Sequence, residues 1–377
     1  MNLKGKPLII IFLFAFIFGL IKFSIDFYFP LLYVELGFDP FQIGLLTAIT
    51  FVVYLLFSAP VGMLCDRKDL RFLILLSLIL FLIFFTGMFF FNEIFIILLL
   101  VILFRLGTLI SKVSLDNILL KFEHSTGNIA LGNFAFFNYL GVMIGMILGG
   151  FILSQIFFPG LFSIMAVLVF LLIPLIFFLP KIETSKSELK EYIADFSDKK
   201  VLIIAFALFL YALHFGAEHI SYTLFLRDNL GLDFFGIGFY MSIAIFFMSL
   251  TAVLSGRIIK KSNLILFFGI SILISGLGHI LMVNDNLIVS LFFRIFHEVG
   301  DALQAVAYLI LLRELFPKTR IGGNSGFFLL FTTLGAIIGS FAFSYIGFGF
   351  GHNLSLIISG ILSILSALVV LLFLYKK

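Results

Sequence analysis

The chain has 377 residues, of which 62% are hydrophobic and only 12% are charged, with a formal net charge of +4. Because soluble domains average about 45–50% apolar and about 25% charged residues, this composition excludes a soluble globular protein, a disordered chain and a nucleic-acid-binding domain. One cysteine, Cys65, excludes a disulfide framework and a metal site built from several thiolates. The sequence contains no phosphate-binding loop, nucleophile elbow or zinc-protease motif, so we expect neither an enzyme nor a bound cofactor.

Twelve apolar stretches follow one another, each close to the length of about 20 residues that a bilayer-spanning helix needs. We expect them at roughly 8–34, 41–64, 72–91, 94–120, 128–155, 161–179, 200–226, 235–256, 262–283, 286–312, 323–347 and 353–375. The longest break between them, residues 181–199, is polar and charged. We therefore predict an all-α membrane protein with twelve transmembrane helices in two pseudo-symmetric six-helix bundles, 1–180 and 200–377, joined by a cytoplasmic linker loop over 181–199.

Basic residues set the expected orientation. If the N-terminus is cytoplasmic, only Arg227 lies in an outer loop, whereas 19 basic residues lie on the cytoplasmic side: Lys4, Lys6, Arg67, Lys68, Arg71, Lys121, Lys181, Lys186, Lys190, Lys199, Lys200, Arg257, Lys260, Lys261, Arg313, Lys318, Arg320, Lys376 and Lys377. Positively charged loops mark the cytoplasmic side. We therefore predict a multi-pass protein of the cytoplasmic membrane with both termini inside the cell.

Ionisable residues inside the spans recur on the first helix of every three. They are Lys22 and Asp26 in span 1, Arg105, Lys112 and Asp116 in span 4, His214, Glu218 and His219 in span 7, and Arg294, His297, Glu298 and Asp301 in span 10. Apart from these, only His279 and His352 lie near the outer ends of spans 9 and 12. Because such groups are costly in hydrocarbon and face an interior or water, the pattern predicts four helices lining one central hydrated cavity.

The two halves resemble each other at an offset near 190 residues. The matching features are Arg105 and Arg294, Gly62 and Gly256, Gly141-x-x-x-Gly145 and Gly335-x-x-x-Gly339, and Asp26 and Glu218/His219. Two six-helix halves joined by one loop are the layout of a secondary transporter built from parallel repeats. A duplication without a transport role is the alternative.

Several of the charges inside the spans are spaced four residues apart, which places them on one helix face. The pairs are Lys22/Asp26, Lys112/Asp116, His214/Glu218, Arg294/Glu298 and His297/Asp301. Each could be an internal ion pair that only offsets the cost of burial, and we favour that interpretation for Lys112/Asp116. On its own helix Glu218 has only histidines as cationic partners, which makes it a candidate proton carrier.

Two further features point to contacts between helices. Asp66 lies at the membrane edge after span 2, where a charge is costly unless it meets a partner, and span 11 begins on the same side with Gly322 and Gly323. A helix N-terminus favours an anion, so we predict a charge latch between the halves; a solvated loop aspartate is the alternative. The glycines of span 5 predict close helix packing.

At these residues the chain resembles the major facilitator superfamily over essentially its whole length. Gly62, Leu64, Asp66, Arg67 and Arg71 match the family's loop signature Gly-x-Leu-x-Asp-Arg-x-Gly-Arg-Arg. Span 5 is similar to the motif of proton-coupled exporters, Gly-x8-Gly-x3-Gly-Pro-x2-Gly-Gly, with all five glycines present (Gly132, Gly141, Gly145, Gly149 and Gly150) and Met146 in place of the proline. Asp26 and Arg105 resemble the membrane-embedded acid and arginine of drug/proton antiporters.

The resemblance implies alternating access, and we predict a secondary active transporter that exports a small, partly apolar molecule in exchange for protons. The expected proton-coupling residues are Asp26, Glu218, Glu298 and Asp301, with Arg105 beside them. The expected substrate-binding residues are His214, His297, Arg294 and Lys22, and the expected gating residues are Gly62, Asp66, Arg67, Arg71, Gly141, Gly145, Gly149 and Gly150. We expect the lipid bilayer, a small-molecule substrate and protons as partners, no nucleic acid, and a monomer.

Three alternatives remain open at the level of the sequence. A divalent-metal exporter is the first, because facing helices offer nitrogen and oxygen ligands from Asp26, His214, Glu218, His219, His297 and Asp301. A lipid or lysolipid transporter is the second, since 55 phenylalanines could line an apolar cavity. An integral-membrane enzyme or receptor on the same fold is the third.

Overall fold

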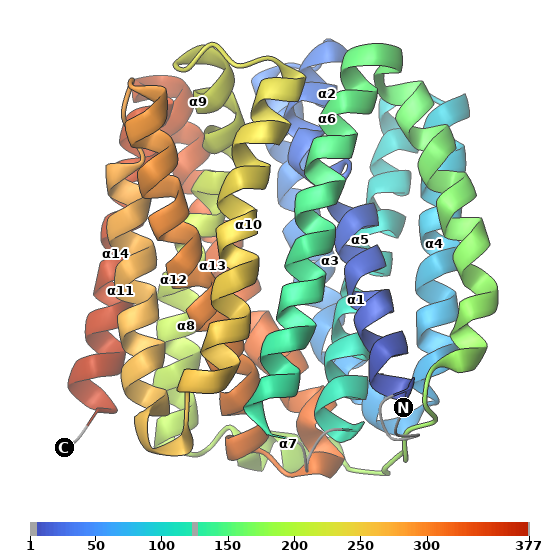
Figure 1. Cartoon of the computed structure of the whole chain (residues 1–377), viewed down its shortest axis with the longest axis vertical. Coiled ribbons are helices and arrows are strands. Elements are labelled where there is room, and N and C mark those ends of the chain that lie inside the picture. Colours follow the sequence, from blue (N-terminus) through green and yellow to red (C-terminus); the bar gives the residue numbers. More distant parts are fainter. Residues whose placement is uncertain (1–5, 123–126, 376–377) are drawn as a thin grey trace.

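The computed structural model describes residues 6–122 and 127–375, and every regular element in these ranges is a helix. Lys4, Lys376 and Lys377, which count toward the predicted orientation, lie outside the described residues. Long helices run side by side along the longest axis of the molecule (Figure 1). The first residues of α1 (Lys6–Phe23) and the last residues of α14 (His352–Phe373) lie at the same end of the molecule as the short helix α7 (Leu189–Asp195). We call this end the α7 face.

The first half continues after α1 with η2 (Asp26–Tyr28), α2 (Phe29–Glu35), α3 (Pro40–Arg67), α4 (Leu70–Phe90), α5 (Ile94–Phe122), α6 (Asn128–Leu172) and η3 (Ile173–Phe178). The second half comprises α8 (Lys199–Ala217), the π-helical η4 (Glu218–Tyr222), α9 (Thr223–Asp228), α10 (Phe234–Ile258), η5 (Lys261–Asn263), α11 (Leu264–Leu281), α12 (Leu287–Leu315), η6 (Lys318–Arg320), α13 (Ile321–Phe350) and α14. The predicted all-helical membrane fold is confirmed.

Helix α6 contains two of the predicted spans. Within the described ranges, eleven apolar helical runs are long enough to cross a membrane, and the run over 128–178 has 51 residues. Its backbone leaves the helical region at Phe157 (φ 54°, ψ −168°), two residues before Pro159. A proline lacks the N–H that a continuous helix requires, and the chain turns back here (Figure 1). The eleven runs therefore give the twelve predicted crossings.

The first span of each half is present as predicted, but its helix is interrupted by a segment of another helical type. In the first half, α1 ends at Phe23 and a 3-10 turn begins at Asp26. In the second half, α8 passes into a π-helical segment that begins at Glu218. Such irregular turns redirect side chains and are frequent at functional sites. In both halves the break falls at the acidic residue that the repeat aligns.

Close helix packing follows the repeat as well. A Cβ atom on Gly141 or Gly145 of α6 would collide with a backbone carbonyl oxygen of α1, and one on Gly335 or Gly339 of α13 would collide with a carbonyl oxygen of α8. Contacts between the halves run mainly along α6 against α10 and α3 against α13.

The linker between the halves is not only a loop. It contains the short helix α7, whose Tyr192 is fully buried.

Candidate functional site

The first charge centre joins η2 to α5. The Asp26 carboxylate forms an ion pair with the Arg105 guanidinium, and the Lys22 Nζ lies 3.6 Å from Asp26 Oδ2. Asp26 and Arg105 are each only 4% exposed. The Arg105 guanidinium also lies over the Phe29 ring, 4.9 Å from its centroid. The predicted Lys22/Asp26 pair is present, but Arg105 is the closer partner.

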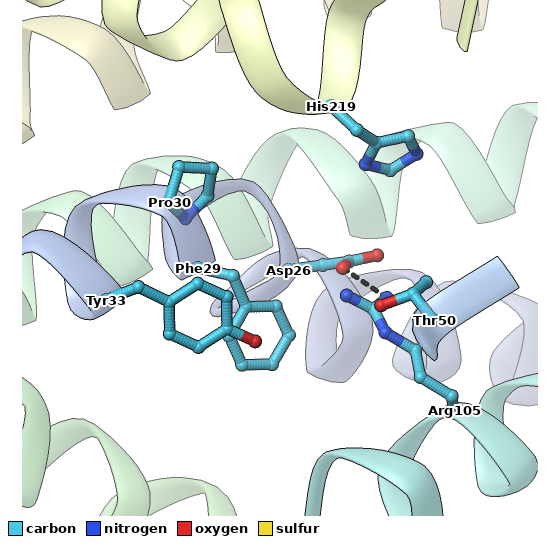
Figure 2. Close-up of a pocket in the computed structure, with 7 residues that line it drawn as sticks. All are labelled: Asp26, Phe29, Pro30, Tyr33, Thr50, Arg105 and His219. Atoms are coloured by element: carbon cyan, nitrogen blue, oxygen red, sulfur yellow. Dashed lines mark hydrogen bonds and ion pairs between the residues drawn. The ribbon is translucent and has the colours of Figure 1, made fainter. Parts of the chain in front are cut away.

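A small cavity of about 10 Å³ lies beside this ion pair, which is room for about one water molecule. Its walls are Asp26, Phe29, Pro30, Tyr33, Thr50, Arg105 and His219. Figure 2 shows His219 reaching toward Asp26 and Arg105 from the opposite side of the cavity. Because His219 belongs to η4, the pocket lies between the two halves of the chain. Asp26 Oδ2 and Arg105 Nε have no hydrogen-bond partner among the described residues.

The second charge centre lies within the second half. Arg294 of α12 forms ion pairs with Glu218 of η4 and Glu298 of α12. The Arg294 guanidinium lies 4.4 Å from the centroid of the Tyr222 ring. The aligned pairs Asp26–Arg105 and Glu218–Arg294 therefore connect the first and fourth spans of their halves in the same way.

His297 links this centre to a third carboxylate. His297 Nε2 lies 3.3 Å from Glu218 Oε1 and 3.5 Å from Asp301 Oδ2, and the Tyr211 hydroxyl donates to Asp301 Oδ1 at 2.7 Å. The expected pair between His214 and Glu218 is not seen in this part of the chain. Glu218 instead contacts Arg294 and His297, because the π-helical turn redirects its side chain.

The two centres differ in charge. With ionised carboxylates and neutral imidazoles, Lys22 and Arg105 face one carboxylate, so the first centre has a net charge of +1. In the second centre Arg294 alone faces Glu218, Glu298 and Asp301, which leaves a net charge of −2. The four predicted helices thus supply two buried charge centres of opposite sign, where the sequence predicted that they line one central hydrated cavity.

The sequence did not assign His279 to the site, although it did show the residue inside span 9. The ring centroid of His279 lies 5.3 Å from that of His214 and 5.0 Å from that of His297. Tyr211 and Ser275 were missed entirely, because a tyrosine or serine in an apolar helix gives no signal in one sequence.

The ligand set predicted for a metal exporter is divided between the two charge centres. Asp26 and His219 lie at the first centre, whereas Glu218, His297 and Asp301 lie at the second.

The predicted contact of Asp66 with the start of span 11 is present. Its buried carboxylate accepts hydrogen bonds from the backbone N–H groups of Gly322 at 3.1 Å and Gly323 at 2.8 Å. The Tyr192 hydroxyl donates to Asp66 at 3.0 Å, and Lys121 Nζ lies 2.7 Å from it. We call Asp66 with these four partners the latch. Lys121 and Tyr192 were missed, since a basic residue at a span end and a tyrosine in a polar linker have obvious surface roles.

The other residues predicted to gate lie around the latch or away from it. A Cβ on Gly62 would collide with the Gly322 carbonyl oxygen, so Gly62 permits the close approach of α3 and α13. Arg67 Nη2 donates to the Ser187 carbonyl oxygen at 2.6 Å. Arg71 pairs locally with Asp69 at 2.7 Å, and this hydrogen bond holds the pKa of Asp69 below its ordinary value.

Helix α7 is also held at this face, through its residue Asp195. Arg320 holds the Asp195 carboxylate with two N–O distances of 2.8 and 2.9 Å, and Asn324 Nδ2 donates to it at 2.8 Å. Partial burial would raise the pKa of Asp195, but the hydrogen bonds from Arg320 and Asn324 hold it below the ordinary value. The α7 face is therefore closed by contacts that join α3, α7 and α13.

The span 5 glycines divide between two roles. Gly141, Gly145 and Gly149 each face a backbone carbonyl oxygen of the first span, within their own half. Gly150 instead lies against the Phe234 carbonyl oxygen and the Tyr28 hydroxyl, at the contact between the halves. Gly132, the first glycine of the motif, also lies at this contact, against the Ala252 carbonyl oxygen and Gly256.

The end opposite the α7 face carries a larger cavity of about 290 Å³. Its walls are Pro30, Val34, Phe38, Ile43, Leu224, Arg227, Asp228, Phe348 and His352, from α2, α3, α9, α13 and α14 and the loop after α2. Figure 1 places α2 and α9 at this end. Pro30 also lines the small pocket beside Asp26, so the two cavities share one wall residue.

Buried ion pairs between helices of two repeated halves, with a pocket where the halves meet, agree with the layout of a secondary transporter. The family description "Major Facilitator Superfamily" matches residues 11–290 and 204–377, and the chain belongs to this family, whose members are transporters and not enzymes. No curated protein matches the chain.

Solved structures show the same fold at low sequence identity. The human organic anion transporter MFSD10 (TETRAN) has a TM-score of 0.76 at 13% identity, covering 98% of this chain and 100% of that one. A POT family transporter in complex with a thioalcohol-conjugated peptide has a TM-score of 0.77 at 16% identity, covering 99% and 98%. A bacterial homologue of the human lysosomal transporter Spinster, inward-facing and unoccupied, has a TM-score of 0.75 at 14% identity, covering 98% and 96%.

Proposed function

We propose that this transporter exports a small, partly apolar molecule in exchange for protons, and that Asp26 carries the coupling proton. The observation that supports the proposal most strongly is the buried Asp26–Arg105 pair beside a pocket between the halves. The pocket offers an apolar wall of Phe29, Pro30 and Tyr33 opposite polar groups. In this structure the pocket has room for about one water molecule, so a substrate with both apolar surface and a polar group enters only when the halves move apart and the pocket widens.

The charge balance of the first centre makes substrate and proton competitors. Ionised Asp26 satisfies Arg105, and removing one member of a buried ion pair costs about 3–5 kcal/mol. When Asp26 is protonated, Arg105 becomes free to bind an acceptor group in another conformation. A substrate group that contacts Asp26 or Arg105 changes the same balance, so binding and proton release are linked.

Alternating access requires each face to open in turn. In this structure the latch and α7 close one face, whereas the cavity of about 290 Å³ lies at the other. The predicted topology makes the closed face cytoplasmic, so the pocket would exchange protons with the outside in this state. We propose that the halves 1–180 and 200–377 rock about the pocket, with α3–α13 separating at the cytoplasmic end. The five glycines of span 5 support export, because the proton-coupled exporters have this motif.

The test uses purified protein in vesicles that contain a trapped pH-sensitive dye, with an acidic interior. A panel of small amphiphiles of similar size (neutral, cationic and anionic) is added outside, and uptake of each compound is measured by mass spectrometry. For a transported compound, the wild type should take it up while the interior becomes more alkaline. Asp26→Asn should lose at least about tenfold of both signals, since protonation near the transported group contributes the coupling.

Asp116→Asn is the matched control, because Asp116 is also a carboxylate on a membrane helix but does not line the pocket, and among the described residues its ion pair is with Lys112 at 2.8 Å. It should keep both signals. Uptake of a compound by the wild type without any change of internal pH would contradict proton coupling. Equal proton exchange by Asp26→Asn and the wild type would contradict the role of Asp26.

A further inference from the structure

Three histidine rings from three helices meet in the second half. His214 of α8, His279 of α11 and His297 of α12 are each fully buried, and their ring centroids lie 5.0–5.7 Å apart. A single buried histidine is ordinary, since its two nitrogens find partners. Three in contact, next to carboxylates, form a donor set whose free atoms decide what it can bind.

Hydrogen bonds fix the tautomer of His214 and His297. The Nδ1 atom of His214 contacts the Tyr211 carbonyl oxygen at 2.5 Å, and that of His297 contacts the Ser275 carbonyl oxygen at 2.8 Å. A carbonyl oxygen only accepts, so each Nδ1 carries a proton and each neutral ring keeps its lone pair on Nε2. His214 Nε2 has no hydrogen-bond partner among the described residues, whereas His297 Nε2 faces Glu218 Oε1 at 3.3 Å and Asp301 Oδ2 at 3.5 Å.

His279 is fixed in the opposite sense. The Ser359 hydroxyl donates its proton to the Leu356 carbonyl oxygen at 2.8 Å, so it accepts from Nε2–H of His279 at 2.9 Å. The lone pair of His279 is then on Nδ1, which has no partner in the described part of the chain. Buried polar atoms are nearly always satisfied. Two imidazole lone pairs without a partner among the described residues, beside a third imidazole nitrogen between two carboxylates, therefore indicate a place for a cation that accepts electron pairs.

Carboxylates complete the donor set. One ring nitrogen each of His214 and His297 and an Asp301 oxygen all lie within 4.8 Å of one another, as do donor atoms of Glu218, His279 and His297. A metal at the centre of three donors spaced 4.8 Å apart would lie about 2.8 Å from each, so donors would move about 0.7 Å to reach zinc bonding distance. Tyr211 holds the second oxygen of Asp301, the outer contact that orients a metal-binding carboxylate.

We propose that this cluster is a binding site for a divalent first-row transition-metal ion, with His214, His297 and Asp301 as ligands and Glu218 and His279 as additional donors. Imidazole with carboxylate suits Zn²⁺ and its neighbours, whereas Mg²⁺ and Ca²⁺ prefer oxygen ligands alone. The charge agrees, because the second centre has three carboxylates and one guanidinium. A divalent cation would bring its net charge to zero. The site is separate from the pocket at Asp26 and does not depend on proton coupling there.

The test measures binding of Zn²⁺ to the full-length protein in detergent, purified without a histidine tag and stripped with a chelator. The wild type should bind one Zn²⁺ per chain and bind Mg²⁺ and Ca²⁺ at least about 100-fold more weakly. Co²⁺ in the same site should give the visible absorption of a low-coordinate nitrogen and oxygen site. His297→Gln and Asp301→Asn should abolish both signals. Tyr211→Phe keeps all ligands and should weaken binding about tenfold.

His352→Gln is the matched control. His352 also has an Nδ1 without a partner among the described residues, but it lies at the start of α14 beside the larger cavity. This variant should bind Zn²⁺ as the wild type does. Absence of stoichiometric Zn²⁺ binding by the folded wild type, equal binding of Mg²⁺, or equal binding by His297→Gln and His352→Gln would overturn the proposal. None of these results would affect the transport test, which concerns Asp26.

Discussion

Replacing Asp66 by asparagine should open the α7 face. The carboxylate accepts two backbone N–H groups from the other half, Gly322 at 3.1 Å and Gly323 at 2.8 Å. Hydrogen bonds to a charged group contribute about 1.5–3 kcal/mol each. An amide has one acceptor oxygen, so one of the two bonds is lost and the other is weakened. The closed arrangement should lose about 3 kcal/mol, which is roughly a 100-fold change in the ratio of closed to open protein.

A buried thiol at the interface reports this change. Ser58 of α3 is fully buried, and its carbonyl oxygen lies against Gly326 of α13. With Cys65 replaced by serine, Ser58→Cys leaves one thiol in the chain. While open protein is the minor form, the rate of thiol labelling follows the open fraction. Adding Asp66→Asn should raise that rate by up to about 100-fold.

Asp69→Asn is the matched control, since Asp69 lies three residues away and pairs only with Arg71 at the surface. Asparagine also caps a helix as well as aspartate does, so labelling should not change. Asp66→Asn also leaves Lys121 buried without its partner, at a cost of about 3–5 kcal/mol. If that variant unfolds, Tyr192→Phe removes one hydrogen bond to the same carboxylate, worth about 1.5 kcal/mol or more, and should raise the rate at least about tenfold. Unchanged labelling in a folded latch variant would refute the reasoning.

Three other predictions concern packing, the linker and orientation. Gly141→Ala forces a Cβ against the Phe16 carbonyl oxygen and should lower stability by about 1–3 kcal/mol in detergent thermal unfolding, whereas Gly349→Ala, with nothing within 4 Å, should not. Arg320→Gln should release α7 and speed tryptic cleavage in the 181–199 linker, whereas Arg227→Gln, which loses only its local pair with Asp228, should not. In intact cells, an impermeant thiol reagent should label Arg227→Cys but reach Lys190→Cys only after permeabilisation, both in the Cys65→Ser background; the reverse pattern would contradict the predicted topology.

The lengths of the apolar runs, the internal repeat and the free-energy cost of a charge in the membrane explain which features could be predicted from the sequence. Apolar runs identified the spans because the bilayer imposes their length, and the repeat paired Asp26 with Glu218 and Arg105 with Arg294. An unpaired carboxylate at the membrane edge would be destabilising, so the sequence also predicted that Asp66 contacts a partner. These inferences needed only the composition of each segment and the spacing of its charges.

Side-chain direction could not be predicted in the same way. At the π-helical turn the Glu218 carboxylate contacts Arg294 and His297, and no residue pattern predicts such a turn. The helix α7 is short, and its docking depends on Tyr192 and Asp195 meeting a distant part of the chain. The histidine cluster needed the packing of α8, α11 and α12, which sequence alone does not give.

Proton release on substrate binding tests the central claim most directly. Detergent-solubilised protein in weak buffer is given a compound that the vesicle assay has shown to be transported, and the pH of the solution is recorded. Competition between substrate and proton at Asp26 predicts that the wild type and Asp116→Asn release protons, and that Asp26→Asn binds the compound without release. Binding by the wild type with no proton released, or equal release by Asp26→Asn, would contradict the account.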